Sequence, residues 1–247
     1  RDPKLEWDSS VPNVGLSGDR FYRPMETLGA YVPYTGSVMS IDPSGRGRDE
    51  TGYAIVKMLN GYLFVTDAGG LQGGYSEEVL KALAMKAKQQ KVNAIVVESN
   101  FGDGMFVELF KPTLLKIHPC TIEEVRHNIQ KEKRIIDTLE PVMNQHRLVV
   151  DPKVIQHDYE SAQTYPLESQ LKYQLIYQMS RLTSQRGAIT HDDRLDALSM
   201  AVAYWTTQMA QDADNRMQER KVDQLDDALR QFEASYKGKK AQTTTWI

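Results

Sequence analysis

Three consecutive β-forming runs, followed by alternating helical and strand-like segments, limit the fold of this 247-residue chain more than any other feature. The runs are residues 36–41, 52–59 and 62–66, and Asn60-Gly61 joins the second run to the third. Asn-Gly is the strongest short hairpin signal, because a type I′ turn needs positive φ angles at both central residues. We therefore expect three successive strands, the last two of them antiparallel.

The rest of the chain alternates predicted helices with short predicted strands. Ser76 is an expected helix N-cap, and apolar residues then follow at helical spacing. The further expected helices are residues 104–115, 131–144, 167–182 and 192–209, and the further expected strands are residues 94–98, 115–119 and 148–150. The glycine-rich residues 68–75 are expected to form a loop.

An antiparallel trio followed by α/β units is the order of the ribonuclease H-like fold. We predict an α/β protein with a mixed sheet of about five or more strands flanked by helices. Residues 1–35 are expected to be an extended lead-in or linker, residues 36–210 the folded domain, and residues 211–247 a charged, partly mobile tail. The first residue is Arg1 rather than Met, which favours a piece of a longer protein.

Composition and missing motifs exclude several classes of protein. A single cysteine rules out an internal disulfide, and five histidines without paired spacing give no zinc site. The glycine-rich segment 69–74 lacks the Lys-Ser/Thr pair of a phosphate-binding loop. No apolar run approaches the roughly 18 residues of a membrane span. The net charge of −3 argues against a whole surface that binds DNA but leaves room for a local basic groove.

Carboxylates stand where the predicted elements end or begin. Asp42 closes the first strand, Glu98 closes the buried strand, and Asp193 and Asp196 share one face at the start of the last helix. Asp196 borders the apolar stripe of that helix, an expensive place for a charge unless a metal or a partner compensates it. Magnesium prefers oxygen ligands, and two such ions about 3.5–4 Å apart promote phosphodiester hydrolysis. The pattern therefore predicts a two-metal site.

Each of these residues also has an ordinary structural alternative. Asp42 suits the start of a β-turn, and Glu98 suits a solvated strand end. Asp193 suits a capping box that begins at Thr190, and both roles can coexist at a helix start. Asp192 and Asp49 are secondary candidates as metal ligands. The expected DNA-contacting residues are Arg46, Arg48, Lys131, Lys133 and Arg134. For the last three the alternative is a solvated helix face.

Four motifs in this order resemble the C-terminal nuclease domain of phage large terminase subunits of the short-tailed podophage type. They are Ser40-Ile41-Asp42-Pro43-Ser44-Gly45, Val97-Glu98-Ser99-Asn100, Lys131-Glu132-Lys133-Arg134-Ile135 and His191-Asp192-Asp193-Arg194-Leu195-Asp196-Ala197-Leu198. The resemblance covers about residues 38–209. It implies that residues 36–210 form a nuclease domain and that residues 1–35 lead in from a missing ATPase domain.

The resemblance also implies an activity and its cofactors. The expected activity is that of a metal-dependent endodeoxyribonuclease of low sequence specificity, which cuts concatemeric viral DNA during genome packaging. Asp42, Glu98 and Asp193 would be catalytic and would hold two Mg²⁺ or Mn²⁺ ions, with Asp196 as an additional ligand. The implied partners are double-stranded DNA and, in the full protein, the portal or procapsid and the small terminase subunit. The implied location is the host cytoplasm, without a membrane.

Other functions on the same fold are alternatives. The last helix also resembles that of Holliday-junction resolvases, whose closing motif has two aspartates three residues apart, as Asp193 and Asp196 are. A junction resolvase or a transposase-like strand-transfer enzyme would therefore use the same residues. A non-catalytic DNA-binding or portal-binding module with a vestigial acidic site is a third reading.

Overall fold

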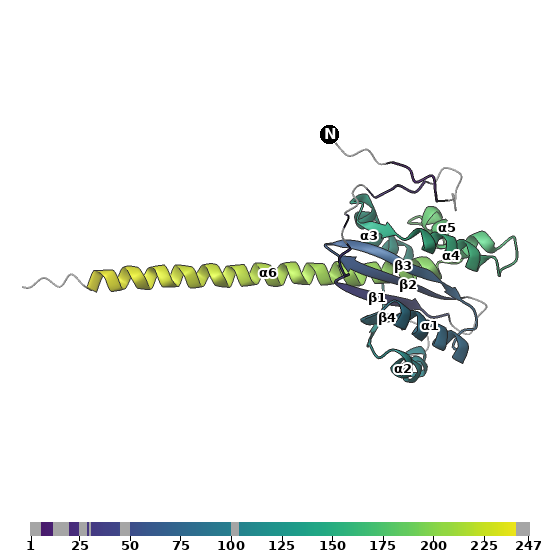
Figure 1. The fold of residues 1–247 in the computed structure, drawn as a ribbon, viewed down its shortest axis with the longest axis horizontal. Coiled ribbons are helices and arrows are strands. Elements are labelled where there is room, and N and C mark those ends of the chain that lie inside the picture. The colour runs from purple at the N-terminus through teal and green to yellow at the C-terminus, as the bar shows by residue number, and fades with distance from the viewer. Residues whose placement is uncertain are drawn as a thin grey trace, which may run out of the picture. The chain divides into compact units, whose positions relative to one another are not determined.

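A six-stranded mixed sheet forms the centre of this α/β protein (Figure 1). The computed structural model describes residues 6–11, 20–24, 29, 31–44, 50–99 and 104–240. The strands are β1 Gly36–Asp42, β2 Thr51–Leu59, β3 Tyr62–Leu71, β4 Ala94–Glu98, β5 Thr121–Val125 and β6 Leu148–Val150. The helices are α1 Glu77–Gln89, α2 Met105–Ile117, α3 Lys131–Asn144, α4 Pro152–Ala162, the 3₁₀ helix η1 Gln170–Tyr173, α5 Leu175–Arg181 and α6 Asp193–Lys240.

The strand order β5-β4-β1-β2-β3-β6 confirms the predicted ribonuclease H-like arrangement. Strands β1, β2 and β3 form the antiparallel trio, whereas β4 and β5 continue the sheet in parallel beyond β1. Asn60 and Gly61 have φ angles of 51° and 82°, as the predicted hairpin turn requires. In the pairing of β1 with β4, Ile41 lies beside Val97, so the next residues, Asp42 and Glu98, end neighbouring strands.

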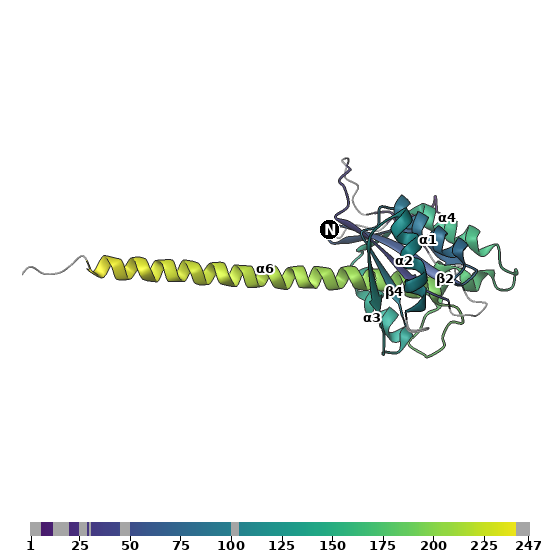
Figure 2. The ribbon, with the colours of Figure 1, turned by 90° about the horizontal axis from the view of Figure 1, so that it is seen from below.

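Different helices cover the two faces of the sheet. Helices α1 and α2 pack on one face, where alternate residues of β1 such as Met39 and Ile41 join their apolar side chains in one core cluster (Figure 2). The first turns of α6 lie on the other face. There the hydroxyl of Ser40 donates to the carbonyl oxygen of Ala197, and the indole nitrogen of Trp205 donates to the carbonyl of Val56 at 2.9 Å. The sheet is therefore buried from both sides along β1 and β2.

The internal contacts of the chain divide it between residues 205 and 206, within α6. The first unit contains the sheet and the helices up to the first turns of α6. Within the described residues, the second unit is the rest of α6, which ends at Lys240. The sequence prediction ended this helix near residue 209, but strong helix formers continue well beyond that point. No helix in the described part of the chain is long and apolar enough to cross a membrane.

Two segments predicted from glycine and proline signals are different in the structure. The loop expected at residues 68–75 is wrong in its first half, because β3 continues to Leu71. A Cβ atom at Gly70 would lie 1.9 Å from Cδ of the buried Glu50, so glycine serves close packing here rather than a turn. The strand expected at residues 115–119 is also wrong. Helix α2 runs to Ile117 with Pro112 inside it, and β5 follows as a polar edge strand.

The region before α6 was also predicted incompletely. The single helix expected at residues 167–182 is two short helices, η1 and α5. They separate because Asp158 accepts hydrogen bonds from the backbone nitrogens of Leu175 and Ile176 at 2.8 and 3.2 Å, which starts a new helix. Helix α4 was missed, although Asp151 and Pro152 carry an N-cap and a first-position proline signal.

Candidate metal centre

Three carboxylates from three separate elements meet at one end of the sheet. Asp42 ends β1, Glu98 ends β4, and Asp196 lies in the first turn of α6. One oxygen atom from each lies within 4.8 Å of the others, and all three residues are buried. Asp196 is fully inaccessible, at 0% exposure. Three carboxylates this close in a buried position repel one another, so they need a compensating positive charge.

The close approach of α6 to the sheet brings Asp196 to this place. Gly52, which pairs with Asp42 across β1 and β2, lies directly against the start of the helix. A Cβ atom at Gly52 would be 2.3 Å from the carbonyl oxygen of Asp193 and 3.0 Å from the nitrogen of Arg194. Only glycine leaves room for the helix backbone at this distance.

Two cations from α3 neutralise part of this acidic cluster, and Lys131 contacts most of its members. Its Nζ atom lies 3.2 Å from Asp42 Oδ2, 2.8 Å from Asp192 Oδ1 and 3.0 Å from Asp196 Oδ2. Burial lowers the pKa of this ammonium, but Asp42, Asp196 and Asp192 together hold it above its ordinary value. Lys131 therefore stays charged among the carboxylates. It occupies the position where a cation is required.

Arg134, one turn further along α3, contacts the other side of the cluster. Its Nη2 atom lies 2.9 Å from Asp196 Oδ1 and 3.5 Å from Glu98 Oε1. Lys131 and Arg134 were predicted as DNA contacts, and in this structure both engage carboxylates instead. Lys133, the third predicted contact of this helix, is exposed.

The pKa values of two carboxyls show that these cations do not complete the neutralisation. Burial raises the pKa of Asp42 to about 6. Lys131 lowers this pKa, whereas the charges of Asp196 and Asp192 raise it. Burial, followed by the charges of Asp196 and Asp42, raises the pKa of Glu98 to about 8. Both carboxyls therefore ionise less readily than free ones, and a cation bound between them would favour their charged forms.

The donor set fits a hard divalent cation. Asp42, Glu98 and Asp196 offer only carboxylate oxygens, which are the ligands that Mg²⁺ and Mn²⁺ prefer. The oxygens converge from two strands and a helix, so the fold holds them together before any ion arrives. A divalent ion at these oxygens would replace the Lys131 contacts with Asp42 and Asp196.

The remaining predicted ligands have different positions. Asp193 is the first residue of α6 and lies outside the triad of Asp42, Glu98 and Asp196. Asp192, the secondary candidate, precedes the helix and binds Lys131. The other predicted residues, Asp49, Arg46 and Arg48, lie outside the described residues.

A buried ion-pair network beside the centre was missed at the sequence level. Arg194 is fully buried, and its guanidinium lies 2.7 Å (Nε) and 3.0 Å (Nη2) from the two carboxylate oxygens of Glu50. Its Nη1 atom lies 2.8 Å from Oδ1 of Asp158 in α4. Helical spacing could have found it, since Arg194 shares the buried stripe of Ala197 and Ala201. The network ties the start of α6 to the segment before β2 and to α4.

Comparisons with known proteins agree with this architecture. Residues 41–148 match the family model described as Terminase Bacteriophage T7, Ribonuclease H-like domain. The chain is 46% identical over 206 residues to the large terminase subunit of Enterobacteria phage T3. The aligned residues cover 83% of this chain and 35% of that protein. The chain thus spans about a third of the length of this relative.

Solved structures with a similar fold have much lower sequence identity. The human cytomegalovirus terminase nuclease domain, Mn soaked and inhibitor bound, is 14% identical with a TM-score of 0.49, covering 69% of this chain and 82% of that one. The nuclease domain of the large terminase subunit gp2 of bacterial virus Sf6 is 14% identical with a TM-score of 0.45, covering 70% and 90%. By the match of residues 41–148, this chain contains a ribonuclease H-like domain of the terminase type, and by the 46% identity it is similar over 206 residues to a terminase large subunit.

Proposed function

We propose that this chain is a metal-dependent endonuclease domain that hydrolyses phosphodiester bonds of double-stranded DNA with low sequence specificity. The observation that carries the proposal is the convergence of Asp42, Glu98 and Asp196 from β1, β4 and α6 within 4.8 Å. A buried cluster of this kind costs folding free energy, and a catalytic metal site is the use that explains its cost.

The metal ligands follow from the positions of the carboxylates. Asp42, Glu98 and Asp196 would hold one Mg²⁺ or Mn²⁺ ion. Asp193, at the start of the same helix, is the proposed ligand of a second ion together with Asp42. When bound, the two ions supply an activated water and stabilise charge on the attacking and leaving oxygens.

Lys131 has two roles in this proposal. Without metal, its ammonium lies 3.2 Å from Asp42 Oδ2 and 3.0 Å from Asp196 Oδ2 and holds both side chains in place. Its side chain is about one-third exposed, at 32%, so it can turn away when a divalent ion takes these oxygens. A DNA phosphate then becomes its next partner, which retains Lys131 as a DNA-contacting residue.

The setting of this activity is proposed from the similarity to the phage T3 large terminase subunit. We propose that the longer protein cuts concatemeric viral DNA during genome packaging in the host cytoplasm. Its partners would be the portal or procapsid and the small terminase subunit. Because the isolated domain has a net charge of −3, we expect it to bind DNA weakly at physiological salt. Nanomolar affinity under those conditions would contradict this expectation.

Plasmid cleavage tests the proposed activity. Supercoiled plasmid is incubated with the 247-residue chain and Mn²⁺ or Mg²⁺, and the nicked and linear products are measured over time. Asp42→Asn and Asp196→Asn should each reduce the rate at least ~100-fold, and Asp193→Ala should reduce it as well. The matched control is Asp137→Asn, which removes an exposed carboxylate from α3.

The outcomes separate the competing readings. Undiminished cutting by the Asp42→Asn or Asp196→Asn variant would sink the assignment of the metal centre. Absence of both Mn²⁺ binding by calorimetry and cutting would favour a non-catalytic module. A strong preference for four-way junctions over linear duplex would favour a resolvase.

A further inference from the structure

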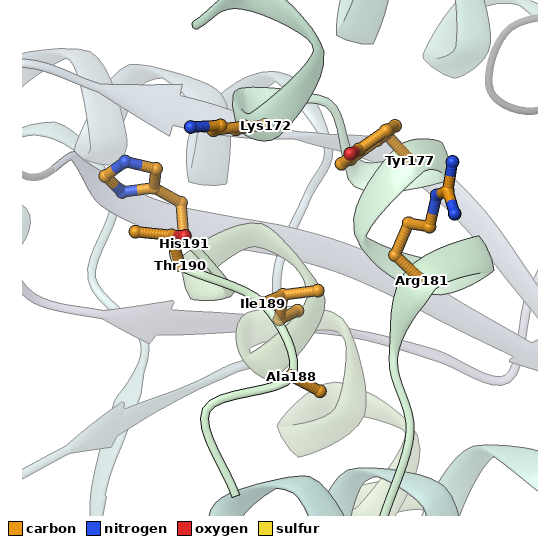
Figure 3. Close-up of a pocket in the computed structure, with 7 residues that line it drawn as sticks. All are labelled: Lys172, Tyr177, Arg181, Ala188, Ile189, Thr190 and His191. Carbon is orange, nitrogen blue, oxygen red and sulfur yellow. The ribbon is translucent and has the colours of Figure 1, made fainter. Parts of the chain in front are cut away.

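A cavity of about 410 Å³ lies beside the metal centre rather than in it. Residues of η1, of α5 and of the segment before α6 line it: Lys172, Tyr177, Arg181, Ala188, Ile189, Thr190 and His191 (Figure 3). Figure 3 shows Lys172 and His191 on one side, Arg181 on the other, and Tyr177 near Arg181. A cavity of this volume is large enough to admit a phosphodiester group with its flanking sugar atoms.

The lining of the cavity favours an anion. Lys172 and Arg181 are both exposed, and neither has an ion-pair partner among the described residues. None of the seven described lining residues carries a carboxylate. The guanidinium carbon of Arg181 lies 5.6 Å from the ring centroid of Tyr177, a cation–π contact that limits its orientations. The Thr190 hydroxyl adds a neutral donor.

The cavity and the metal centre are joined by a short piece of backbone. His191, in the cavity wall, comes two residues before Asp193, so their Cα atoms lie at most ~7 Å apart. The ring of His191 stacks on Tyr173, with ring centroids 4.2 Å apart, and Tyr173 stacks on Tyr165 at 3.6 Å. Tyr165 donates to Glu50, which also binds Arg194. The cavity wall is thus tied to the network that holds the start of α6.

The cavity also supplies cationic side chains for binding DNA, which the metal centre lacks while its own cations are paired with carboxylates. The two predicted DNA-contacting residues that face the centre, Lys131 and Arg134, are engaged with its carboxylates. The cavity wall adjoins the centre through His191, because the next residue, Asp192, accepts from Lys131 Nζ at 2.8 Å. A strand whose scissile phosphate lies at the metal centre can therefore run past the cavity and present another of its phosphates there.

We propose that this cavity binds a backbone phosphate of the DNA strand, away from the bond that is cut. The identity of the ligand as DNA rests on the proposed nuclease function. Lys172 and Arg181 donate to the phosphate oxygens from opposite sides, and the contact carries no sequence preference. The subsite holds the strand in register while the carboxylates of the metal centre are still paired with Lys131 and Arg134.

Metal-free binding of duplex DNA tests the subsite separately from cleavage. A fluorescent 20-base-pair duplex is titrated with the chain in EDTA at a series of salt concentrations, for the unmodified protein and for the Lys172→Gln/Arg181→Gln double variant. The variant should bind about tenfold more weakly at low salt. The slope of log K against log salt should become shallower by about 0.9, because the variant loses the neutralisation of one phosphate.

The matched control is the Lys88→Gln/Lys91→Gln double variant. These lysines are exposed and precede β4, at the end of the sheet opposite Asp42 and Glu98, and the variant has the same net charge as the test variant. It should retain at least half of the affinity and the original slope. Equal losses in both variants would attribute the effect to net charge and overturn the proposal. An unchanged slope in the Lys172/Arg181 variant would overturn it as well.

The proposed nuclease function fails or survives independently of this result. If the unmodified chain cuts plasmid but the cavity variant binds normally, only the subsite is wrong. If no cutting occurs with any divalent ion, the nuclease proposal fails, and the EDTA titration still decides whether the cavity binds DNA. Thermal unfolding of both double variants should match the unmodified chain, since the four replaced side chains are exposed.

Discussion

Replacing Gly52 by alanine should inactivate the metal centre without removing any of its ligands. The added Cβ atom would lie 2.3 Å from the carbonyl oxygen of Asp193, about 1.1 Å short of the 3.4 Å at which ordinary contact begins. The obstructing atoms are helix backbone, so α6 must move away from β2 by about that amount. Asp196 moves with it, while Asp42 and Glu98 remain on the sheet. A displacement near 1 Å costs about 100-fold in rate, and overpacking costs about 1–3 kcal/mol of stability.

The assay is the initial rate of plasmid cutting in Mn²⁺, with the folded fraction of each protein measured by urea unfolding. Gly36→Ala is the control, because its Cβ atom would meet the end of the Trp205 ring at 2.7 Å, a clash with a side chain rather than with helix backbone. Gly36 begins β1 about 20 Å along the strand from Asp42. We expect Gly36→Ala to lose stability and keep its cutting rate within about threefold. A folded Gly52→Ala variant that cuts at half the original rate or faster would refute the reasoning.

Three further predictions concern charge. Lys131→Gln removes the ammonium that competes with a metal ion for the oxygens of Asp42 and Asp196. Calorimetry should then show Mn²⁺ binding about 3- to 10-fold tighter, and weaker binding would contradict the competition. In the metal-free folded state the pKa of Asp42 is about 6 instead of the ordinary 3.8, and the pKa of Glu98 is about 8 instead of 4.5. Between pH 4 and 8 the folded state therefore holds more protons than the unfolded state. Its free energy of unfolding should therefore fall as pH rises through that window and recover with Mn²⁺ at pH 8; a metal-free increase would be the contrary result. Arg194→Met leaves the carboxylates of Glu50 and Asp158 buried without their cation and should cost about 3–5 kcal/mol in urea unfolding, and a loss under 1 kcal/mol would show that the network is not required.

Local signals in the sequence were sufficient for the hairpin of β2 and β3 and for the start of α1. The Asn60-Gly61 turn defines the hairpin through the φ angles of two adjacent residues, and Ser76 caps α1 through one short-range hydrogen bond. Signals of this kind failed where a distant partner decides the conformation. Glycines that look like a loop extend β3 because Gly70 packs against Glu50, and one expected helix is divided because Asp158 caps α5.

The sequence by itself determined the three successive strands, the buried strand that ends at Glu98 and the placement of acidic residues at the ends of these elements. The tertiary structure decided which acidic residues meet. Asp196 joins Asp42 and Glu98, and Lys131 lies among them, because α6 crosses β2 in backbone contact at Gly52 and α3 turns one face toward the cluster. Such contacts connect residues far apart in the chain and depend on space left between backbones, for which no short stretch of sequence carries a signal.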